Sequence, residues 1–259
     1  MDFKLTKKEE LARERVCLAL DVPTYDDALE YVEKLRDFAK YFKVGKELFT
    51  AEGPGLLVDI QSMDREVFLD LKYHDTPNTV KGAARAATAL SVSMFNVHAS
   101  GGLEMMKAAV EGANEAVEKY RDLEMPKILA VTVLTSIDQR IMNEELRVPG
   151  RVEDQVLHYA KLADKAGLDG IVCSAADLYA VKNHLRKDFM YVTPGVKGPN
   201  SKAGSDQKRV FTAGNAIQDG SSILVIGRAV TDPLGTGKAT FDEMRKSAYD
   251  ILQDMAPFV

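Results

Sequence analysis

The sequence has few cysteines, no long apolar run and no excess of basic residues. Its two cysteines, Cys17 and Cys173, each lie within an apolar run, which predicts buried thiols in a reduced cytoplasmic protein. Neither a disulfide framework nor a CxxC metal site is present. No apolar run approaches the roughly 18 to 20 residues that span a bilayer, and the highly charged N-terminal segment does not resemble a signal peptide. We therefore expect no membrane-bound segment.

The charge balance also excludes some partners. The chain carries 34 basic and 39 acidic residues, a formal net charge of −5, so its surface has no general attraction for nucleic acid. An anionic ligand would need a local binding site. Apolar residues make up 46% of the 259 residues and charged residues 28%, which is typical of a globular protein. There is no linker, low-complexity segment or repeat of fixed period, although length alone fits one large domain or two small ones.

Short apolar runs alternate with helix-length segments along the whole chain. Such near-continuous runs are typical of parallel strands that are covered on both faces. Between them, Val152, Val156, Tyr159 and Ala163 share one helical face, and Ala83, Ala86, Ala87 and Leu90 share another. The runs are 16–20, 41–44, 67–71, 94–97, 128–133, 170–173, 190–192 and 223–226.

Eight such repeats predict a (β/α)₈ barrel, an α/β fold of about 250 residues, as a single domain over 1–259. A doubly wound open sheet is the alternative, but no GxGxxG follows the first strand. Thr6 and Glu9 fit a capping box, which predicts a short helix before the first strand. The polar segment Gly195–Lys208 follows the seventh strand, and we interpret it as a mobile lid or as a plain surface loop.

Charged side chains stand at the carboxyl ends of several predicted strands. Because side chains alternate across a strand, Asp70 and Lys72 share the inward face while their apolar neighbours face outward. The same alternation turns Lys43, Asp21 and His98 inward. Strand ends of this kind carry the catalytic residues of (β/α)₈ barrels. A structural ion network is the alternative interpretation, but buried charges persist only when they are paired or used.

Histidine gives a weaker signal. A satisfied structural role and a catalytic role are equally compatible with His98 at a strand end. The other three histidines, His74, His158 and His184, lie in helix or loop segments and form no metal-ligand set with it. We therefore predict no metal.

The last apolar run ends in Gly227 and Arg228, which suggests a phosphate site. Glycine lets the backbone approach a ligand, the following helix start offers N–H groups, and arginine is a bidentate donor. Barrels of this class often bind phosphate after strands seven and eight. A chance Gly-Arg pair is the alternative.

The segment 70–80, with the sequence DLKYHDTPNTV, resembles the signature of the orotidine 5′-monophosphate decarboxylase family. Related sugar-phosphate decarboxylases keep Asp-x-Lys-x-x-Asp but not the Pro-Asn-Thr that follows. Other family-like segments occur in the family's order from the first strand to the last. They are 18–23 (LALDVP), 42–49 (FKVGKELF), 96–102 (NVHASGG), 130–136 (AVTVLTS), 192–196 (VTPGV) and 225–228 (VIGR).

The resemblance implies a role for each matching residue. Lys43, Asp70, Lys72 and Asp75 would form the family's alternating array, with Lys72 as the proton donor to C6 of the pyrimidine. Asp75 would come from the partner of a homodimer. Without the resemblance, Asp75 would simply precede a helix that has Thr76 at its N-cap and Pro77 at its first position.

Further residues would bind the rest of the nucleotide. The resemblance assigns Asp21, Lys43 and Thr79 to the ribose, Thr135 to the pyrimidine, and Lys197, Gln207, Gly227 and Arg228 to the phosphate. Lys197 stands where many bacterial members have arginine, so it would offer a point charge in place of a bidentate donor.

The activity that the resemblance implies is the decarboxylation of orotidine 5′-monophosphate to UMP, in pyrimidine biosynthesis and without a cofactor. No pyridoxal or thiamine motif is visible to supply an electron sink, so fixed electrostatics would stabilise the charge at C6. Two alternatives remain: a sugar-phosphate decarboxylase or aldolase on the same scaffold, and a non-catalytic nucleotide sensor. The Pro-Asn-Thr segment argues against the first, and the complete set of four charges argues against the second.

Overall fold

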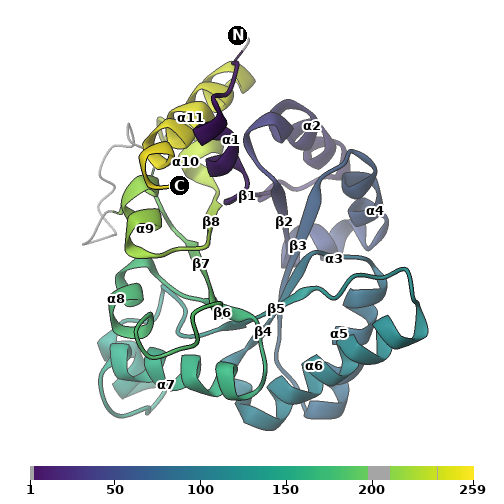
Figure 1. Cartoon of the computed structure of the whole chain (residues 1–259), viewed down its shortest axis with the longest axis vertical. Coiled ribbons are helices and arrows are strands. Elements are labelled where there is room, and N and C mark those ends of the chain that lie inside the picture. The colour runs from purple at the N-terminus through teal and green to yellow at the C-terminus, as the bar shows by residue number, and fades with distance from the viewer. Residues whose placement is uncertain (1–2, 198–210, 238) are drawn as a thin grey trace. The chain divides into compact units, whose positions relative to one another are not determined.

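The computed structural model describes residues 3–197, 211–237 and 239–259 (Figure 1). Within them, eight strands pair in sequence order as a closed parallel barrel, which confirms the (β/α)₈ prediction over the doubly wound sheet. Every predicted apolar run forms a strand. The strands are β1 (Val16–Ala19), β2 (Tyr41–Gly45), β3 (Glu66–Tyr73), β4 (Met94–His98), β5 (Lys127–Val131), β6 (Gly170–Val172), β7 (Met190–Pro194) and β8 (Ile223–Ile226).

Helices follow the strands along the chain. The α-helices are α1 (Lys7–Arg13), α2 (Tyr25–Leu35), α3 (Lys46–Glu52), α4 (Gly55–Ser62), α5 (Pro77–Ala89), α6 (Gly102–Lys119), α7 (Val152–Lys165), α8 (Leu178–Val181), α9 (Ala213–Asp219), α10 (Arg228–Thr231) and α11 (Phe241–Met255). Shorter helical segments are η1 (Arg36–Phe38), η2 (Ala99–Gly101), η3 (Ile141–Glu145), η4 (Ala175–Asp177) and η5 (Ala256–Phe258). In the part of the chain that the structure describes, none of the helices has the length and apolar character needed to cross a bilayer.

The chain divides into two compact units. Unit 1 comprises Met1–Phe68 with Thr193–Val259, and unit 2 comprises Leu69–Val192. The boundaries fall within β3 and within β7, so two strands run from one unit into the other. The interpretation of the chain as a single domain stays a prediction.

Unit 1 contains the first two strands, the last strand and the predicted N-terminal helix. Helix α1 begins after Thr6, whose hydroxyl accepts from the Glu9 N–H while the Glu9 carboxylate accepts from the Thr6 N–H. This confirms the predicted capping box. Strand β1 lies between β2 and β8, with Ala19 opposite Lys43 and Leu18 opposite Ile226. That register sets the ends of all three strands at the same level.

Unit 2 contains β4, β5 and β6 and the closely packed helices α5 and α6 (Figure 1). A Cβ at Gly112 of α6 would lie 2.1 Å from the Lys81 carbonyl oxygen of α5, so the helices approach at a distance that only glycine permits. The buried face of α5 consists of Val80, Ala84, Ala87 and Thr88. The buried face predicted from the sequence was wrong: it included Ala86, which is exposed, so the true face is rotated about the helix axis. Alanine's small side chain marks a helix face poorly.

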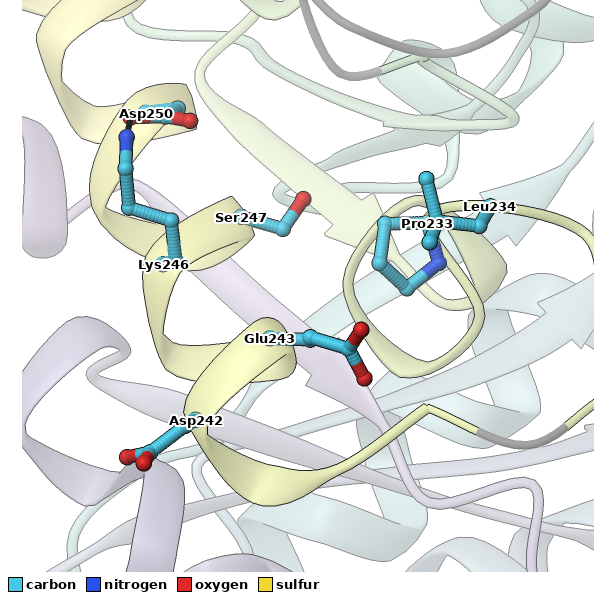
Figure 2. Close-up of a pocket in the computed structure, with 7 residues that line it drawn as sticks. All are labelled: Pro233, Leu234, Asp242, Glu243, Lys246, Ser247 and Asp250. Carbon is cyan, nitrogen blue, oxygen red and sulfur yellow. Dashed lines mark hydrogen bonds and ion pairs between the residues drawn. The ribbon is translucent and has the colours of Figure 1, made fainter.

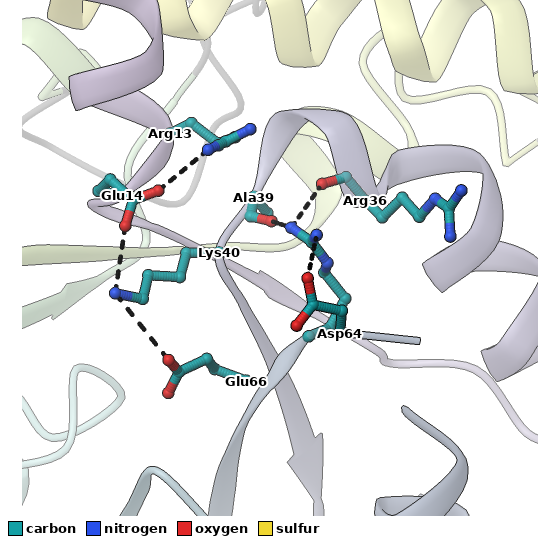
Figure 3. Close-up of polar contacts among 8 residues, drawn as sticks. Arg13, Glu14, Arg36, Ala39, Lys40, Asp64 and Glu66 are labelled. Atoms are coloured by element: carbon teal, nitrogen blue, oxygen red, sulfur yellow. Dashed lines mark hydrogen bonds and ion pairs between the residues drawn. The ribbon is translucent and has the colours of Figure 1, made fainter. Parts of the chain in front are cut away.

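Ion pairs also gather at the amino ends of the first three strands, in unit 1 (Figure 3). Lys40, just before β2, lies 3.1 Å from a Glu14 oxygen and 3.9 Å from a Glu66 oxygen. Burial alone would raise the pKa of Glu14, but hydrogen bonds from Lys40 and Arg13 lower it overall. These contacts tie strand starts together. Charges at this end of a (β/α)₈ barrel serve stability, whereas those at the carboxyl ends serve chemistry.

Candidate active site

In unit 1, Lys43 of β2 forms an ion pair with Asp21, which lies two residues after the end of β1. The Lys43 Nζ lies 3.2 Å from the Asp21 Oδ1, and Lys43 is 9% exposed whereas Asp21 is open to solvent. The parallel register produces this contact, because Lys43 pairs with Ala19, two residues before Asp21. Gly227 lies beside them, since a Cβ there would be 3.5 Å from the Asp21 Oδ2. The predicted inward orientation of Lys43 and Asp21 agrees with this contact.

In unit 2, Asp70 and Lys72 form a second ion pair at the carboxyl end of β3. The Lys72 Nζ donates to the Asp70 Oδ1 at 2.6 Å, so the two side chains lie on the same face, as strand alternation predicts. Asp70 is 8% exposed. A carboxylate at this depth needs cationic or polar partners to offset its lost hydration.

Asn96 of β4 joins this pair and was missed as a site residue by sequence reasoning. Its Nδ2 donates to the Asp70 Oδ1 at 2.7 Å, and its Oδ1 accepts from the Lys72 backbone N–H at 2.8 Å. Asn96 is 1% exposed. The available signal was an inward amide in an otherwise apolar strand, two residues before His98. A polar group in such a position needs partners that are themselves polar.

The turn into α5 holds two more predicted site residues. Thr76 is the N-cap and Pro77 the first helical residue, as predicted, but the Thr76 side chain makes no capping hydrogen bond. Instead its hydroxyl lies 3.1 Å from the Thr79 hydroxyl. The Asp75 carboxylate accepts from the Thr76 N–H at 2.6 Å. Asp75 and Thr79 are exposed, so both can reach a ligand or another protein chain.

The predicted phosphate residues of unit 1 include a buried cation. The Lys197 Nζ is buried and has no hydrogen-bond partner among the described residues. A buried ammonium group without a partner is costly, so this position favours an anion. Arg228, the first residue of α10, is exposed. Gln207 and most of the predicted lid lie outside the described residues.

Two other predicted positions have simpler surroundings. Thr135 is exposed in the segment that follows β5. His98 ends β4, and its ring centroid lies 5.4 Å from that of His74. Cys17 and Cys173 are both buried, as predicted, and burial raises the pKa of the Cys173 thiol.

A cavity of about 300 Å³ lies in unit 1 (Figure 2). It lies between α11 and the segment after α10. Glu243 in its wall is part of the capping box that begins α11, with its carboxylate accepting from the Thr240 N–H at 2.7 Å. The residues that line it are Pro233, Leu234, Asp242, Glu243, Lys246, Ser247 and Asp250. None of them matches a predicted ligand contact.

Asp177, after β6, is a largely buried carboxyl whose ionisation opposes folding. Burial raises its pKa from 3.8 to about 6, although the Ser174 backbone N–H lowers it and Glu153 adds to the rise. The folded protein therefore holds this proton more tightly than the unfolded chain does. The contribution of the Asp177 proton to the free energy of unfolding is fully present below pH 3.8 and is lost as the pH rises through about 6.

We expect Asp177→Asn to stabilise the protein above pH 6 and to have little effect near pH 4. The gain should approach about 3 kcal/mol at pH 8, since each pKa unit corresponds to ~1.4 kcal/mol. Urea unfolding at a series of pH values measures it. Asp138→Asn is the control, because exposed Asp138 also accepts a backbone N–H, from Ile141 at 2.8 Å. A gain that does not grow with pH would contradict this assignment.

Comparison with known proteins identifies relatives of this chain. Residues 14–239 match the family model described as "Orotidine 5'-phosphate decarboxylase / HUMPS family". The chain is 42% identical to orotidine 5'-phosphate decarboxylase of Moorella thermoacetica, covering 90% of this chain and 93% of the relative. It is 46% identical to the enzyme of that name from Syntrophus aciditrophicus, over 89% and 90%. The crystal structure of orotidine 5'-phosphate decarboxylase from Lactobacillus acidophilus is similar, with 33% identity, a TM-score of 0.76, and coverage of 91% and 99%.

Proposed function

Because this chain belongs to the orotidine 5′-phosphate decarboxylase family, we propose that it converts orotidine 5′-monophosphate to UMP and CO₂ in pyrimidine biosynthesis. The observation that carries this proposal is the Asp70–Lys72 ion pair, which lies at the carboxyl end of β3 within the family's signature segment. The carboxyl ends of barrel strands are the catalytic positions of this fold. We further propose that the protein acts in the cytoplasm.

In this proposal each ion pair has the role that the family resemblance assigns to its residues. Asp21 and Lys43 bind the ribose hydroxyls, with Thr79 as a further hydroxyl donor. Asp70 and Lys72 face C6 and its carboxylate, and Thr135 binds the pyrimidine edge. Within each pair, the opposite charges compensate one another when water is excluded, which supports these roles.

The chemistry replaces a carboxylate at C6 by a proton. The C6–carboxylate bond breaks, CO₂ leaves, and the electron pair remains at C6 with no adjacent carbonyl placed to delocalise it. The Lys72 ammonium group stabilises that charge and then delivers its proton, forming the C6–H bond and a neutral amine that water reprotonates. Lys72 thus supplies the charge stabilisation for which other decarboxylases use a cofactor. Asp70 orients Lys72 by accepting a hydrogen bond from its Nζ, 2.6 Å from the Asp70 Oδ1.

The phosphate is bound by other residues. Gly227 offers backbone N–H and close approach, Arg228 a bidentate fork, and Lys197 the ammonium group that lacks a partner among the described residues. Gln207 is the fourth proposed contact. These residues bind the end of the substrate that does not react, so their binding energy serves to align the ring and exclude water.

Turnover of orotidine 5′-monophosphate by the purified protein tests the function directly. The pyrimidine absorbance should change as UMP forms, without added metal or cofactor. Activity on a sugar phosphate in its place would support the alternative enzyme on this scaffold. Tight UMP binding without turnover would support a sensor. Either result would reject the decarboxylase.

We propose a homodimer in which Asp75 completes the partner's site, because Asp75 is exposed at the start of α5. Asp75→Ala and Lys72→Ala should each be nearly inactive when pure. Mixed, dissociated and reassociated, they should regain about a quarter of the parent's activity, since a hybrid dimer has one site with both native residues.

Light scattering should give the mass of a dimer before and after mixing. An active monomer, or two inactive variants that stay inactive after subunit exchange is shown by differently tagged chains, would contradict the shared site.

A further inference from the structure

The buried amide of Asn96 contacts both members of the proposed catalytic pair. Its Nδ2 donates to the Asp70 Oδ1 at 2.7 Å, the same oxygen that accepts from the Lys72 Nζ at 2.6 Å. Its Oδ1 accepts from the Lys72 backbone N–H at 2.8 Å. One side chain of β4 therefore contacts Asp70 through its carboxylate and Lys72 through its backbone.

Lys72 adopts a backbone conformation that lysine rarely takes. Its φ is +51°, in the left-handed region, although it lies within β3. Such a conformation is unfavourable for a residue with a Cβ, so it persists where surrounding contacts favour it. The hydrogen bond from the Lys72 N–H to the Asn96 side chain is such a contact.

The chemistry of the contacts fixes the orientation of the amide. A backbone N–H can only donate, and an ionised carboxylate can only accept. A flipped amide would set N–H against N–H at Lys72 and oxygen against oxygen at Asp70. Asparagine satisfies both partners, whereas an ionised aspartate or a leucine of similar size would not.

We propose that Asn96 is a positioning residue that holds Lys72 and Asp70 in their reactive geometry. This inference rests on the decarboxylase function proposed above. Lysine has a flexible four-carbon chain, so a fixed backbone and a fixed carboxylate are needed to direct its Nζ at one substrate atom. Asn96 fixes both. It acts through Lys72 and Asp70 and needs no contact with the substrate.

Asn96→Ala should lower kcat about 10²-fold, because small displacements of a catalytic group have effects of that order. The KM for orotidine 5′-monophosphate should change less than threefold, since the proposed ribose and phosphate contacts are unaltered. A change in KM alone would overturn the proposal. Thr88→Val is the matched control, because the buried Thr88 hydroxyl donates to the Ala84 carbonyl at 2.9 Å within α5. It should lose stability and keep the parent's kcat.

Asn96→Asp adds a readout that a purely structural role would not change. The new carboxylate would lie against Asp70, and two adjacent carboxylates cannot both ionise easily. When protonated, it can donate to Asp70 as the amide does. The kcat deficit of Asn96→Asp relative to the parent should therefore shrink at least fivefold between pH 8 and pH 5.5. A deficit that is independent of pH would overturn the proposal.

Hydrogen exchange of the Lys72 amide separates this inference from the proposed function. In the parent, the amide should exchange at least tenfold more slowly than in Asn96→Ala, with or without turnover. Equal exchange rates would overturn the contact even in an active enzyme. An inactive parent with a protected Lys72 amide would reject the decarboxylase and retain the contact, whereas an active parent with unchanged kcat in both Asn96 variants would reject the positioning role alone.

Discussion

Replacing Lys72 by alanine should lower kcat for orotidine 5′-monophosphate by about 10⁴-fold or more. Two effects combine: the charge at C6 loses its nearest cation, and the new C6–H bond loses its proton donor. Each effect alone is typically about 10² to 10⁴-fold. The Asp70 carboxylate would also lose the ammonium group at 2.6 Å and remain nearly buried beside the developing negative charge. The product absorbance in a long incubation at high enzyme concentration measures the residual rate.

Lys127→Ala is the matched control in the same unit. The Lys127 Nζ lies 3.0 Å from the Asp169 Oδ1, so this substitution also removes a lysine from an ion pair. Lys127 begins β5, however, whereas Lys72 lies near the end of its strand. The kcat of Lys127→Ala should equal that of the parent. A Lys72→Ala variant within tenfold of the parent would remove Lys72 from the chemistry.

The strand pattern of the sequence was sufficient to predict the fold and to place Asp70 beside Lys72, but it did not predict that Lys43 pairs with Asp21. A barrel strand is buried on both sides, so its apolar run is easily recognised, and a charge at its end stands out. Strict alternation then places Asp70 with Lys72. Lys43 meets Asp21 for a different reason, because parallel neighbours end at the same level. The Asp70–Lys72 contact therefore follows from local geometry, which sequence encodes directly, whereas the Lys43–Asp21 contact depends on how two strands are aligned.

The backbone of Lys72 and the partners of Asn96 could not be predicted in the same way. A left-handed lysine has no local signature, since its cost is offset by a contact from another strand. Asn96 is a single inward amide, and its two partners lie 24 and 26 residues earlier in the chain. The buried Lys197 Nζ likewise depends on tertiary packing. The strand pattern therefore missed the contacts that depend on how separate segments pack together.

Replacing Arg228 by alanine should lower kcat/KM for orotidine 5′-monophosphate about 10²- to 10³-fold. Two charge-assisted hydrogen bonds to a phosphate are lost, and each is worth roughly 1.5–3 kcal/mol. If phosphate binding serves to align the ring, part of the loss must appear in kcat as well as in KM. Steady-state kinetics over a wide substrate range separates the two.

Orotidine, which lacks the phosphate, makes this prediction specific. Without a phosphate there is nothing for the guanidinium group to bind, so parent and Arg228→Ala should decarboxylate orotidine at equal, slow rates. Arg121→Ala removes an exposed arginine in the turn after α6 and should match the parent on both substrates. If Arg228→Ala raised KM alone, phosphate binding would provide affinity without aligning the ring. If it slowed orotidine equally, Arg228 would act on the fold or on the chemistry and not on the phosphate.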